Sequence, residues 1–385
     1  MRVLFVAGYD HAAYHRKVEL LADAPDVDLL HVTVTGYGRD SGWYPSADGR
    51  RRYRVQTFGA RWLGGPADGH RACLWPPHFG LNRFRPEIIQ YESDVETLGS
   101  AELVLARAVL ARQARLIGYS WQNILRKRRL TVKWLVRMNL RAVDHMICSS
   151  TEAVTVLRRQ GYARGASVMP LVGVDRRLFY PRPALQVRAS LGLDGWVVGY
   201  VGRLVPEKGV DVLLRAFRQL PQAGHLLIVG DGSERAALQS LAESLGIGSR
   251  CRFQTGVPYD LVANYMNAMD VLVLPSRTTP NWKEQFGRVL VEAMACQVAV
   301  AGSDSGAIPE VIARPECVFP EGDSAALARI LKRLTDDPSA RLAVAGRGYE
   351  RVQNEYTTER LAERLLALWR GMCPSAGGET MDGLL

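Results

Sequence analysis

The sequence contains none of the features that mark a membrane-embedded or exported protein. No apolar run in its 385 residues approaches the ~20 residues that cross a bilayer. The N-terminal string MRVLFVAGYDH has an apolar stretch too short for a signal peptide, with no small-residue cleavage site after it. We therefore expect a cytoplasmic protein.

Cysteine is scarce and scattered along the chain. The six cysteines form no C-x-x-C pair and have no histidine at ligand spacing. This argues against a disulfide framework and a structural zinc site, and it favours packing roles in a reducing compartment. Internal repeats and low-complexity segments are also missing from a composition that is otherwise ordinary for a globular protein.

The net charge of +10 is concentrated in the first half of the chain. Residues 1–180 carry 27 Lys and Arg against 16 Asp and Glu, whereas residues 181–385 carry 22 against 23. Residues 101–150 alone hold ten basic and two acidic side chains. Only the first half is therefore expected to meet a polyanion or an anionic surface.

Short apolar strands alternate with helical patterns in two successive series, which predicts an α/β fold with parallel sheets. In the first series we predict a helix at Ala101–Arg115 behind Ser100 as N-cap, and a hairpin arm around Gly49–Phe58. The predicted strands are Val3–Ala7, Asp28–Thr35, Glu87–Tyr91, Leu116–Ser120 and His145–Cys148.

The second series begins after a Pro-containing joint at residues 181–183. Its predicted strands are Val197–Val201, Leu226–Val229, Arg252–Gln254, Val271–Leu274 and Val298–Ala301. Its predicted helices are Val210–Leu220, Glu234–Leu245 and Phe286–Cys296. We therefore expect two Rossmann-like doubly wound domains facing across a cleft, at residues 1–180 and 181–355, with a loose tail that includes residues 374–385.

Ligands of parallel α/β domains bind at the carboxyl ends of the strands, beside helix N-termini. The segment GYVGRLVPEKG at residues 199–209 ends a predicted strand and supplies Arg203 and Lys208, two cations able to hold one diphosphate. The segment GDG at residues 230–232 is a strand-to-helix turn. Taken alone, the first segment is equally consistent with two solvated surface cations. The second is by itself a weak signal that favours an ordinary turn.

The segment EQFGRVLVEAMAC at residues 284–296 carries two carboxylates. The predicted helix Phe286–Cys296 is apolar around most of its circumference and is expected to be buried. Glu292 within it needs hydrogen-bond donors, which either ribose hydroxyls or a nearby arginine would supply. Glu284 lies just before the helix, where free N–H groups and the helix dipole favour phosphate or sugar oxygens.

A fourth segment, SDSGAIPE at residues 303–310, is a turn expected next to the carboxylate helix. The order GRLxxEKG, GDG, EQFGRVLVEA and SGAIPE resembles glycosyltransferase family 4, which comprises retaining enzymes of the GT-B architecture. The resemblance is good over residues 142–370 and holds only in outline before them. Its most specific element is the pair formed by Glu284 and Glu292.

The resemblance implies that Glu284 holds donor-sugar hydroxyls, that Glu292 holds the ribose, and that Arg203 and Lys208 bind the diphosphate. Further expected donor contacts are Gly202, Asp231, Val257, Pro258, Phe286, Gly287 and Leu290. UDP is the commonest donor nucleotide of the family, and GDP donors also occur. A C-terminal helix, here about Thr358–Trp369 within residues 356–371, is expected to cross back onto the first domain.

The resemblance also implies the chemistry. Retention requires no separate base, because the leaving diphosphate accepts the proton of the incoming hydroxyl while Arg203 and Lys208 stabilise the leaving group. We expect no essential metal, since these cations replace it, and no cofactor, since the nucleotide sugar is a substrate. Asp26-Val-Asp28 leads into a strand and has no phosphate-facing context.

The sequence departs from the family pattern at three places. The loop after the first strand reads GYDHAA from Gly8, where many members have Gly-Gly. Trp121-Gln122-Asn123 stands where many members have a histidine, which puts any histidine role there in doubt. Gln297 replaces the usual glycine after the carboxylate helix.

In the first domain, Glu92, Asp94 and Gln122 end predicted strands and are expected to face the acceptor, although solvated loop acids would look the same. The segment Ile124–Arg141 interleaves apolar residues with cations. It is consistent with a helix on an anionic membrane surface and equally with a basic face over a core stripe. Nucleic acid is not expected, because no reader motif accompanies the charge.

Three functions remain open from the sequence. The main one is hexosyl transfer to a hydroxyl acceptor in polysaccharide, glycolipid or glycosylated-metabolite biosynthesis. The second is a nucleotide-sugar epimerase of the same architecture, against which the Glu284 and Glu292 pair argues. The third is a non-catalytic surface-binding scaffold with a vestigial nucleotide pocket. The oligomeric state is not readable from the sequence.

Overall fold

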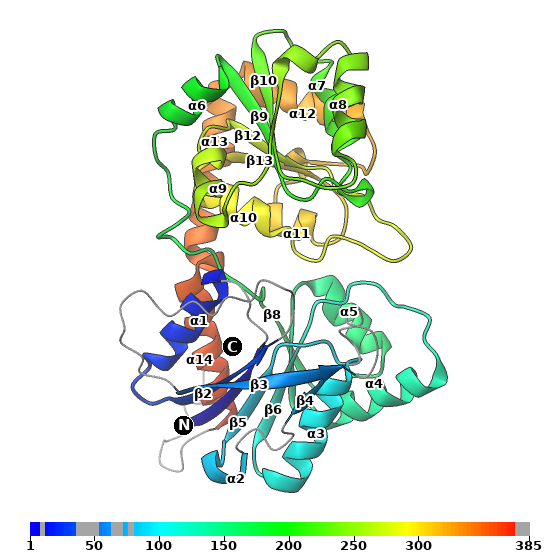
Figure 1. Cartoon of the computed structure of the whole chain (residues 1–385), viewed down its shortest axis with the longest axis vertical. Coiled ribbons are helices and arrows are strands. Elements are labelled where there is room, and N and C mark those ends of the chain that lie inside the picture. The colour runs from blue at the N-terminus through cyan, green and yellow to red at the C-terminus, as the bar shows by residue number, and fades with distance from the viewer. Residues whose placement is uncertain (8–11, 36–53, 63–71, 76–80, 374–385) are drawn as a thin grey trace. The chain divides into compact units, whose positions relative to one another are not determined.

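The computed structural model describes residues 1–7, 12–35, 54–62, 72–75 and 81–373, and the chain divides into two compact units (Figure 1). Unit 1 comprises residues 1–149, 153–173 and 358–385, and unit 2 comprises residues 150–152 and 174–357. Residues 174–180, which the sequence assigned to the first domain, belong to unit 2. The reason is packing, because Val174 bridges to Thr357 and Phe179 is buried in the core of unit 2.

The sheet of unit 1 has eight strands in the order β4-β3-β2-β1-β5-β6-β7-β8. The strands are β1 (Arg2–Val6), β2 (Asp28–Thr35), β3 (Arg54–Trp62), β4 (Ala72–Trp75), β5 (Ile88–Tyr91), β6 (Arg115–Ser120), β7 (His145–Cys148) and β8 (Gly165–Val168). All neighbours are parallel except β3 and β4. The helices are α1 (Ala12–Ala22), α2 (Leu81–Phe84), α3 (Leu98–Leu110), α4 (Leu130–Ala142), α5 (Thr151–Arg159) and α14 (Thr358–Met372).

Both faces of this sheet are buried, as the apolar strands predict for a parallel sheet. Successive side chains of β1 point to opposite faces, so Leu4 enters one core cluster and Phe5 enters the other. Val104 of α3 and Leu140 of α4 pack in the first of these clusters. Residues of α1 and α14 fill the second.

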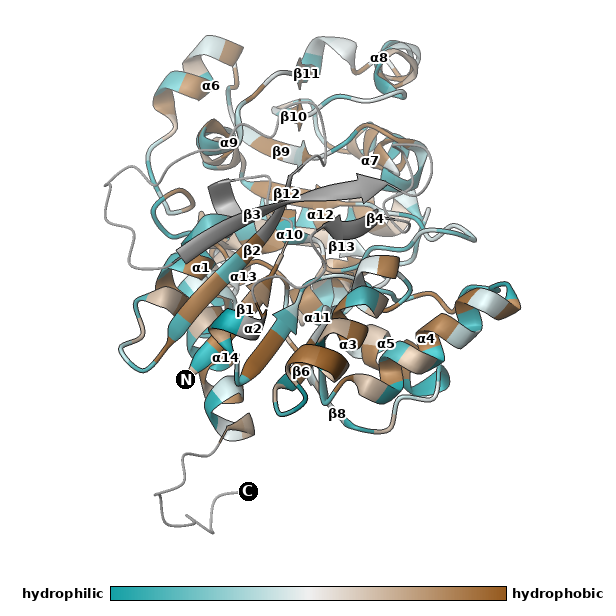
Figure 2. Cartoon of the chain, turned by 60° about the horizontal axis from the view of Figure 1, so that its bottom comes forward, coloured by the Kyte–Doolittle hydropathy of each residue, from teal (hydrophilic) through white to brown (hydrophobic). Residues whose placement is uncertain are grey.

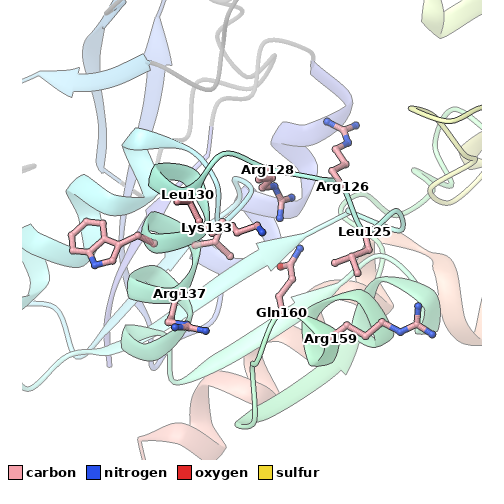
Figure 3. A pocket seen from close by; sticks show the side chains of 10 residues that line it. Leu125, Arg126, Arg128, Leu130, Lys133, Arg137, Arg159 and Gln160 are labelled. Atoms are coloured by element: carbon pink, nitrogen blue, oxygen red, sulfur yellow. The ribbon is translucent and has the colours of Figure 1, made fainter.

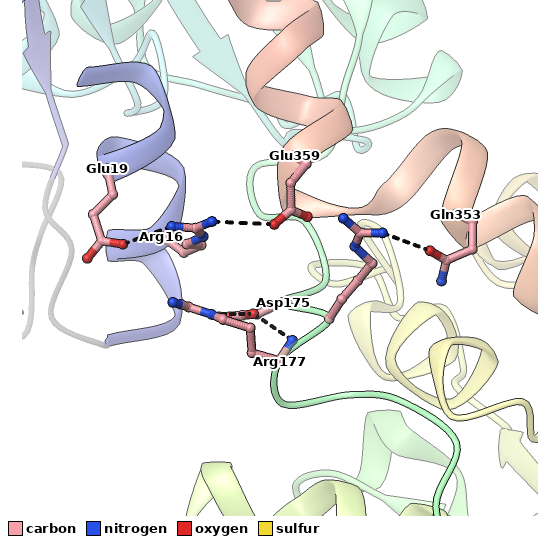
Figure 4. A network of polar contacts seen from close by, with 7 residues as sticks. Arg16, Glu19, Asp175, Arg177, Gln353 and Glu359 are labelled. Carbon is pink, nitrogen blue, oxygen red and sulfur yellow. Dashed lines mark hydrogen bonds and ion pairs between the residues drawn. The ribbon is translucent and has the colours of Figure 1, made fainter. Parts of the chain in front are cut away.

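Helix α14 comes from the far end of the chain and completes unit 1. Trp369 is fully buried there, and its indole Nε1 donates to Oε1 of Gln90 on β5 at 2.7 Å. Arg16 of α1 pairs with Glu359 of α14 at 3.8 Å (Figure 4). The expected return of the C-terminal helix to the first domain is therefore observed, while the predicted tail at 374–385 lies outside the described residues.

Two local predictions for unit 1 are wrong in part. Helix α3 begins earlier than expected because Thr97, not Ser100, is its N-cap and accepts the N–H of Ser100 at 3.1 Å. The predicted hairpin arm at Gly49–Phe58 is observed as the antiparallel pair β3 and β4, but it is not a separate arm in its described part, since β3 also pairs with β2 over six positions. Residues 49–53 lie outside the described residues.

The sheet of unit 2 has six parallel strands in the order β11-β10-β9-β12-β13-β14. The strands are β9 (Trp196–Val201), β10 (Gly224–Val229), β11 (Cys251–Gln254), β12 (Val271–Leu274), β13 (Ala299–Ser303) and β14 (Val318–Phe319). The helices are α6 (Leu185–Leu191), α7 (Val210–Phe217), α8 (Arg235–Ser244), α9 (Tyr259–Met266), α10 (Arg288–Ala295), α11 (Ile308–Ile312), α12 (Ser324–Asp336) and α13 (Pro338–Arg351).

The predicted alternation of strands and helices is confirmed in both units, and the bounds of β2, β7 and β12 are as predicted. The buried core of unit 2 is continuous across its sheet and includes β9, β12 and α10. The cysteines at 148, 251, 296 and 317 are buried without a disulfide partner. Among the described residues, no helix combines the length and the apolar character needed to cross a bilayer.

Candidate functional site

The strand order of unit 2 creates a switch point between β9 and β12. From β9 the chain proceeds outward to β10 and β11, and it then returns to the other side of β9 as β12. The loops that leave the carboxyl ends of β9 and β12 therefore diverge, and the space between them is the usual ligand site of such sheets. The loop after β9 carries Arg203 and Lys208, and the loop after β12 carries Glu284.

Glu284 is buried and has two partners drawn from both sides of the switch point. The ammonium of Lys208 donates to its Oε2 at 2.6 Å, and the hydroxyl of Ser276 donates to the same oxygen at 2.9 Å. The Lys208 ammonium also lies 4.7 Å from the ring centroid of Trp282. The two residues expected to meet the sugar and the diphosphate thus lie in direct contact.

Arg203 differs from Lys208 in its surroundings. Its side chain is 66% exposed and lies 3.8 Å from Glu207, a distance at which an exposed pair contributes little. Its guanidinium therefore needs little rearrangement to contact an anion at the carboxyl end of β9.

The turns after β9 and β10 are joined by backbone hydrogen bonds. Gly202 donates to the carbonyl of Val229 at 3.0 Å, and Leu204 donates to the carbonyl of Asp231 at 2.8 Å. A Cβ atom at Gly230 would lie 1.9 Å from the carbonyl oxygen of Gly202, so only glycine permits this approach. The carboxylate of Asp231 is exposed and accepts the N–H of Gly232.

The carboxylate helix begins later than predicted. Helix α10 starts at Arg288 with Gly287 as its N-cap, so Phe286 and Gly287 precede the helix. Phe286 packs edge-on against Tyr356 at 5.7 Å. The N–H of Leu290 donates to the carbonyl of Gly287 at 2.9 Å. This N–H, which was expected to contact the nucleotide sugar, therefore already has an acceptor within the protein.

Glu292 is the buried carboxylate of α10, and its partners are a tyrosine and an arginine. The Tyr259 hydroxyl donates to Oε1 at 2.8 Å, and Nε of Arg288 lies 3.0 Å from the same oxygen. Burial raises the pKa of Glu292, and Arg288 and then Tyr259 oppose that shift. The nearby arginine that the sequence left open is therefore present, four residues before Glu292.

The remaining segments that the sequence assigned to the donor lie around these residues. Tyr259 opens α9, with Pro258 as an exposed N-cap and Val257 half-buried before it. The turn at 303–310 is tied to the same region, because the N–H of Ala307 donates to the carbonyl of Glu284 at 3.1 Å. Ser303 also donates to the carbonyl of Ser276 at 2.6 Å. The four sequence segments therefore converge on one end of the sheet.

In unit 1, Glu92 does not face an open site. Its carboxylate and the ammonium of Lys17 form a buried pair at 2.6 Å, and Lys17 also donates to the carbonyl of Leu171 at 2.7 Å. Burial raises the pKa of Glu92 and lowers that of Lys17. The side chain of Glu92 is only 2% exposed, and its role toward the acceptor stays a prediction.

Asp94 and Gln122 belong to a second buried network at the carboxyl ends of β5 and β6. Ser120 donates to Oδ1 of Asp94 at 3.2 Å, and burial raises the pKa of Asp94 from 3.8 to about 7. The amide of Gln122 bridges Glu96 and Arg128, which pair with each other at 2.5 Å. These contacts fix the end of the sheet and leave little of either predicted side chain exposed.

Several residues of these networks were missed at the sequence level. Ser276 is the second residue after β12, in the loop to Glu284, so its position was a usable signal. Trp282 and Tyr259 carry no motif that separates them from core aromatics. Lys17 and Glu96 carry no sequence motif that distinguishes them from ordinary surface charges. No group of three or more His, Cys, Asp or Glu residues in the described part of the chain is arranged to hold a metal ion.

Comparisons with known proteins agree with this arrangement. Residues 184–351 match the family model described as glycosyl transferases group 1. The chain is 31% identical over 245 residues to 2-deoxystreptamine glucosyltransferase of Streptomyces kanamyceticus, which covers 61% of each protein. The chain thus spans less than two thirds of that relative.

A second relative is matched over a longer stretch. It is the GDP-mannose-dependent alpha-(1-6)-phosphatidylinositol monomannoside mannosyltransferase of Mycolicibacterium smegmatis, 31% identical over 302 residues. That match covers 71% of this chain and 77% of the relative.

The fold agrees with a solved structure of HepE from Anabaena in complex with UDP. The TM-score is 0.75 at 19% identity, and the match covers 96% of this chain and 100% of HepE. At this identity the likeness shows the fold alone, which is the GT-B class expected from the sequence. On the family model and the longer of the two sequence matches, this chain belongs to the glycosyl transferases group 1.

Proposed function

We propose that this protein is a retaining glycosyltransferase of family 4 that transfers a sugar from a nucleotide-diphosphate donor, expected to be a UDP-sugar, to a hydroxyl acceptor. The observation that carries the proposal is the placement of Lys208 and Glu284 on opposite sides of the β9/β12 switch point, 2.6 Å apart. A cation and a carboxylate at that position suit two parts of a nucleotide sugar, its anionic diphosphate and its neutral ring, whose hydroxyls donate hydrogen bonds.

In this proposal the diphosphate is held by Arg203 and Lys208, and the sugar hydroxyls donate to Glu284. The ribose hydroxyls donate to Glu292, whose Oε1 is held by Tyr259 and Arg288. The solved HepE structure in complex with UDP-glucose supports a nucleotide-sugar donor on this fold. A GDP-sugar is the alternative donor, since one relative is GDP-mannose-dependent.

The chemical step needs no protein base. The bond between the anomeric carbon and the diphosphate oxygen breaks, and the acceptor oxygen bonds to that carbon on the same face. The acceptor proton passes to the departing diphosphate, whose developing charge Arg203 and Lys208 stabilise. Electrostatic contributions of this kind are worth about 3–4 kcal/mol for a single well-placed donor.

The acceptor is proposed to be a hydroxyl of a polysaccharide, a glycolipid or a glycosylated metabolite. Gln122 and Asp94 hold the end of the unit 1 sheet in place and are assigned to positioning rather than to direct contact. We further propose a cytoplasmic location with peripheral contact to the inner membrane face through segment 124–141.

Calorimetric titration of the full chain with UDP, GDP and ADP tests the donor assignment. We expect UDP to bind with micromolar affinity and Glu292→Ala to abolish that binding. Tyr259→Phe is the matched control, because it removes one hydrogen bond to Glu292 and keeps the carboxylate. Its expected cost is about 1 kcal/mol, or less than tenfold in affinity.

The same experiment separates the alternatives. Binding of UDP that is equal in wild type and Glu292→Ala would remove the donor assignment and favour the scaffold. Incubation with a UDP-sugar and no acceptor then distinguishes transfer from epimerisation, since a 2-epimer forms only in the second case. Release of UDP together with the free sugar, by transfer to water and without a 2-epimer, supports the transferase.

A further inference from the structure

Unit 1 has a pocket that shares only Arg128 with the networks described above. It is lined by segment 124–129, by α4 and by the end of α5, and its volume is about 430 Å³ (Figure 3). Only Leu130 to Ala142 of the predicted membrane segment is helical, so the structure corrects the expected helix Ile124–Arg141. The pocket forms where the extended part and the helix meet Arg159 and Gln160.

The lining of this pocket is strongly basic. Five of its ten described residues are Lys or Arg and none is acidic. Arg128 is already paired with Glu96. Lys133, Arg137 and Arg159 have no acidic partner among the described residues. Three like charges around one cavity repel one another, so an anion inside it would relieve that repulsion.

An unused hydrogen-bond donor also belongs to the pocket. The side-chain Nε2 of Gln160 is buried and has no hydrogen-bond partner among the described residues. Figure 3 shows the Gln160 and Lys133 side chains directed toward the middle of the group. A buried N–H without a partner costs free energy, and an oxygen-rich ligand in the pocket would accept from it.

Apolar side chains stand exposed beside the cations. Leu130 is 81% exposed and Trp134 is 67% exposed, one turn apart on α4. The core stripe of this helix is a different one, formed by Val136, Asn139 and Leu140. Figure 2 shows both hydrophilic and hydrophobic residues along α4. The exposed pair is therefore not explained by packing within unit 1.

We propose that this pocket seats the head-group phosphate of an anionic phospholipid while Trp134 and Leu130 enter the bilayer interface. Cations attract anionic lipid, and an exposed Trp and Leu beside them suit the depth of the head groups. The proposal deepens the membrane contact proposed for segment 124–141 by naming the phosphate seat. It is tested by binding and not by turnover, so its failure leaves the donor assignment untouched.

The test is co-sedimentation of the full chain with vesicles of phosphatidylcholine, alone or mixed with phosphatidylglycerol. We expect binding only to the mixed vesicles, weakening as salt is raised. Lys133→Ser with Arg137→Ser should lower the partition coefficient roughly 5-fold for each cation removed. Trp134→Ser should lower it further in a separate variant, because the interfacial contact is lost.

Each matched control makes the same kind of substitution at an exposed position outside the pocket. Arg141→Ser removes an exposed cation of α4 that does not line the pocket, and it should change binding less than Lys133→Ser does. Val109→Ser, at an apolar position 74% exposed on α3, is the control for Trp134→Ser. Circular dichroism on every variant establishes that the fold is retained.

Four results would overturn the proposal. They are equal binding to pure phosphatidylcholine, unchanged binding of the double charge variant, full competition by soluble glycerol phosphate, and preferential binding of an oligonucleotide. The third would indicate a soluble phosphorylated ligand and the fourth a nucleic acid.

Discussion

The ammonium of Lys208 lies 2.6 Å from Oε2 of Glu284, although the two residues are 76 positions apart in the chain. Their loops leave neighbouring strands, β9 and β12, at the same end of the sheet. Without a donor, each charge neutralises the other. A bound diphosphate would compete for Lys208, and a sugar hydroxyl would take its place as the partner of Glu284.

Glu284→Gln is therefore expected to separate chemistry from binding. We expect the rate of UDP release from a UDP-sugar to fall about 100-fold or more, since an active-site interaction of about 3 kcal/mol is lost. UDP affinity should stay the same or increase, because the carboxylate no longer competes for Lys208. Initial rates and calorimetry measure the two effects.

Ser276→Ala is the control for this variant, because it removes only the 2.9 Å hydrogen bond to the same oxygen. It should cost less than about tenfold in rate. A Glu284→Gln protein with wild-type turnover would show that Glu284 is structural.

The pH dependence of the free energy of unfolding should include a contribution from the protonation of Asp94. Burial raises its pKa from 3.8 to about 7, so the folded state binds this proton more tightly than the unfolded state does. Its contribution therefore makes stability fall as pH rises from 3.8 to about 7, by at most about 1.4 kcal/mol per pH unit. Asp94→Asn should remove that part of the slope, which urea unfolding at several pH values measures.

Asp23→Asn, at an exposed position after α1, is the control and should keep the wild-type profile. An Asp94→Asn slope equal to that of the wild type would assign the pH dependence to other buried groups, such as Glu92.

A substitution at Gly209 tests how closely the loop that carries Lys208 must approach the backbone of Pro275. Its φ is +62°, and an added Cβ would lie 2.1 Å from the carbonyl oxygen of Pro275. Gly246 has a similar φ of +70° with no atom within 4 Å of that position. Gly246→Ala should therefore cost only the left-handed backbone conformation, about 1–2 kcal/mol.

Gly209→Ala should cost more than Gly246→Ala in the free energy of unfolding, and it should also weaken UDP binding by moving Lys208. Equal costs for the two variants, with unchanged UDP affinity, would show that the loop relaxes without consequence. Denaturant unfolding and calorimetry give the comparison.

Trp369 should be essential to the stability of unit 1. Trp369→Ala removes a fully buried indole and leaves Oε1 of Gln90 without that donor, which should cost about 3–5 kcal/mol. Arg370→Ala, one residue later, breaks an exposed pair with Asp26 and should cost less than about 1 kcal/mol. Comparable destabilisation of both variants would mean that α14 is held by its surface charges.

The sequence alone predicted the parts of the site that rest on local pattern. Arg203, Lys208, Glu284 and Glu292 follow strands or lie on a helix whose periodicity is readable, and their convergence follows from the geometry of parallel sheets. Prediction from the sequence failed where the hydrogen-bond or ion-pair partners of a residue come from distant segments of the chain. Nothing in the pattern around Glu92 indicated that Lys17 would pair with it. The pattern around Asp94 also did not indicate the burial that raises its pKa.

The amino-acid sequence by itself determined the two α/β series and the charged residues of the candidate site, because apolar periodicity and charged residues at strand ends are local properties. Only the tertiary structure decided which charges are already paired, that α14 completes unit 1, and that Trp134 stands outside the core stripe of α4. The physical reason is that burial and pairing depend on segments brought together by folding, and their spacing along the chain does not encode them.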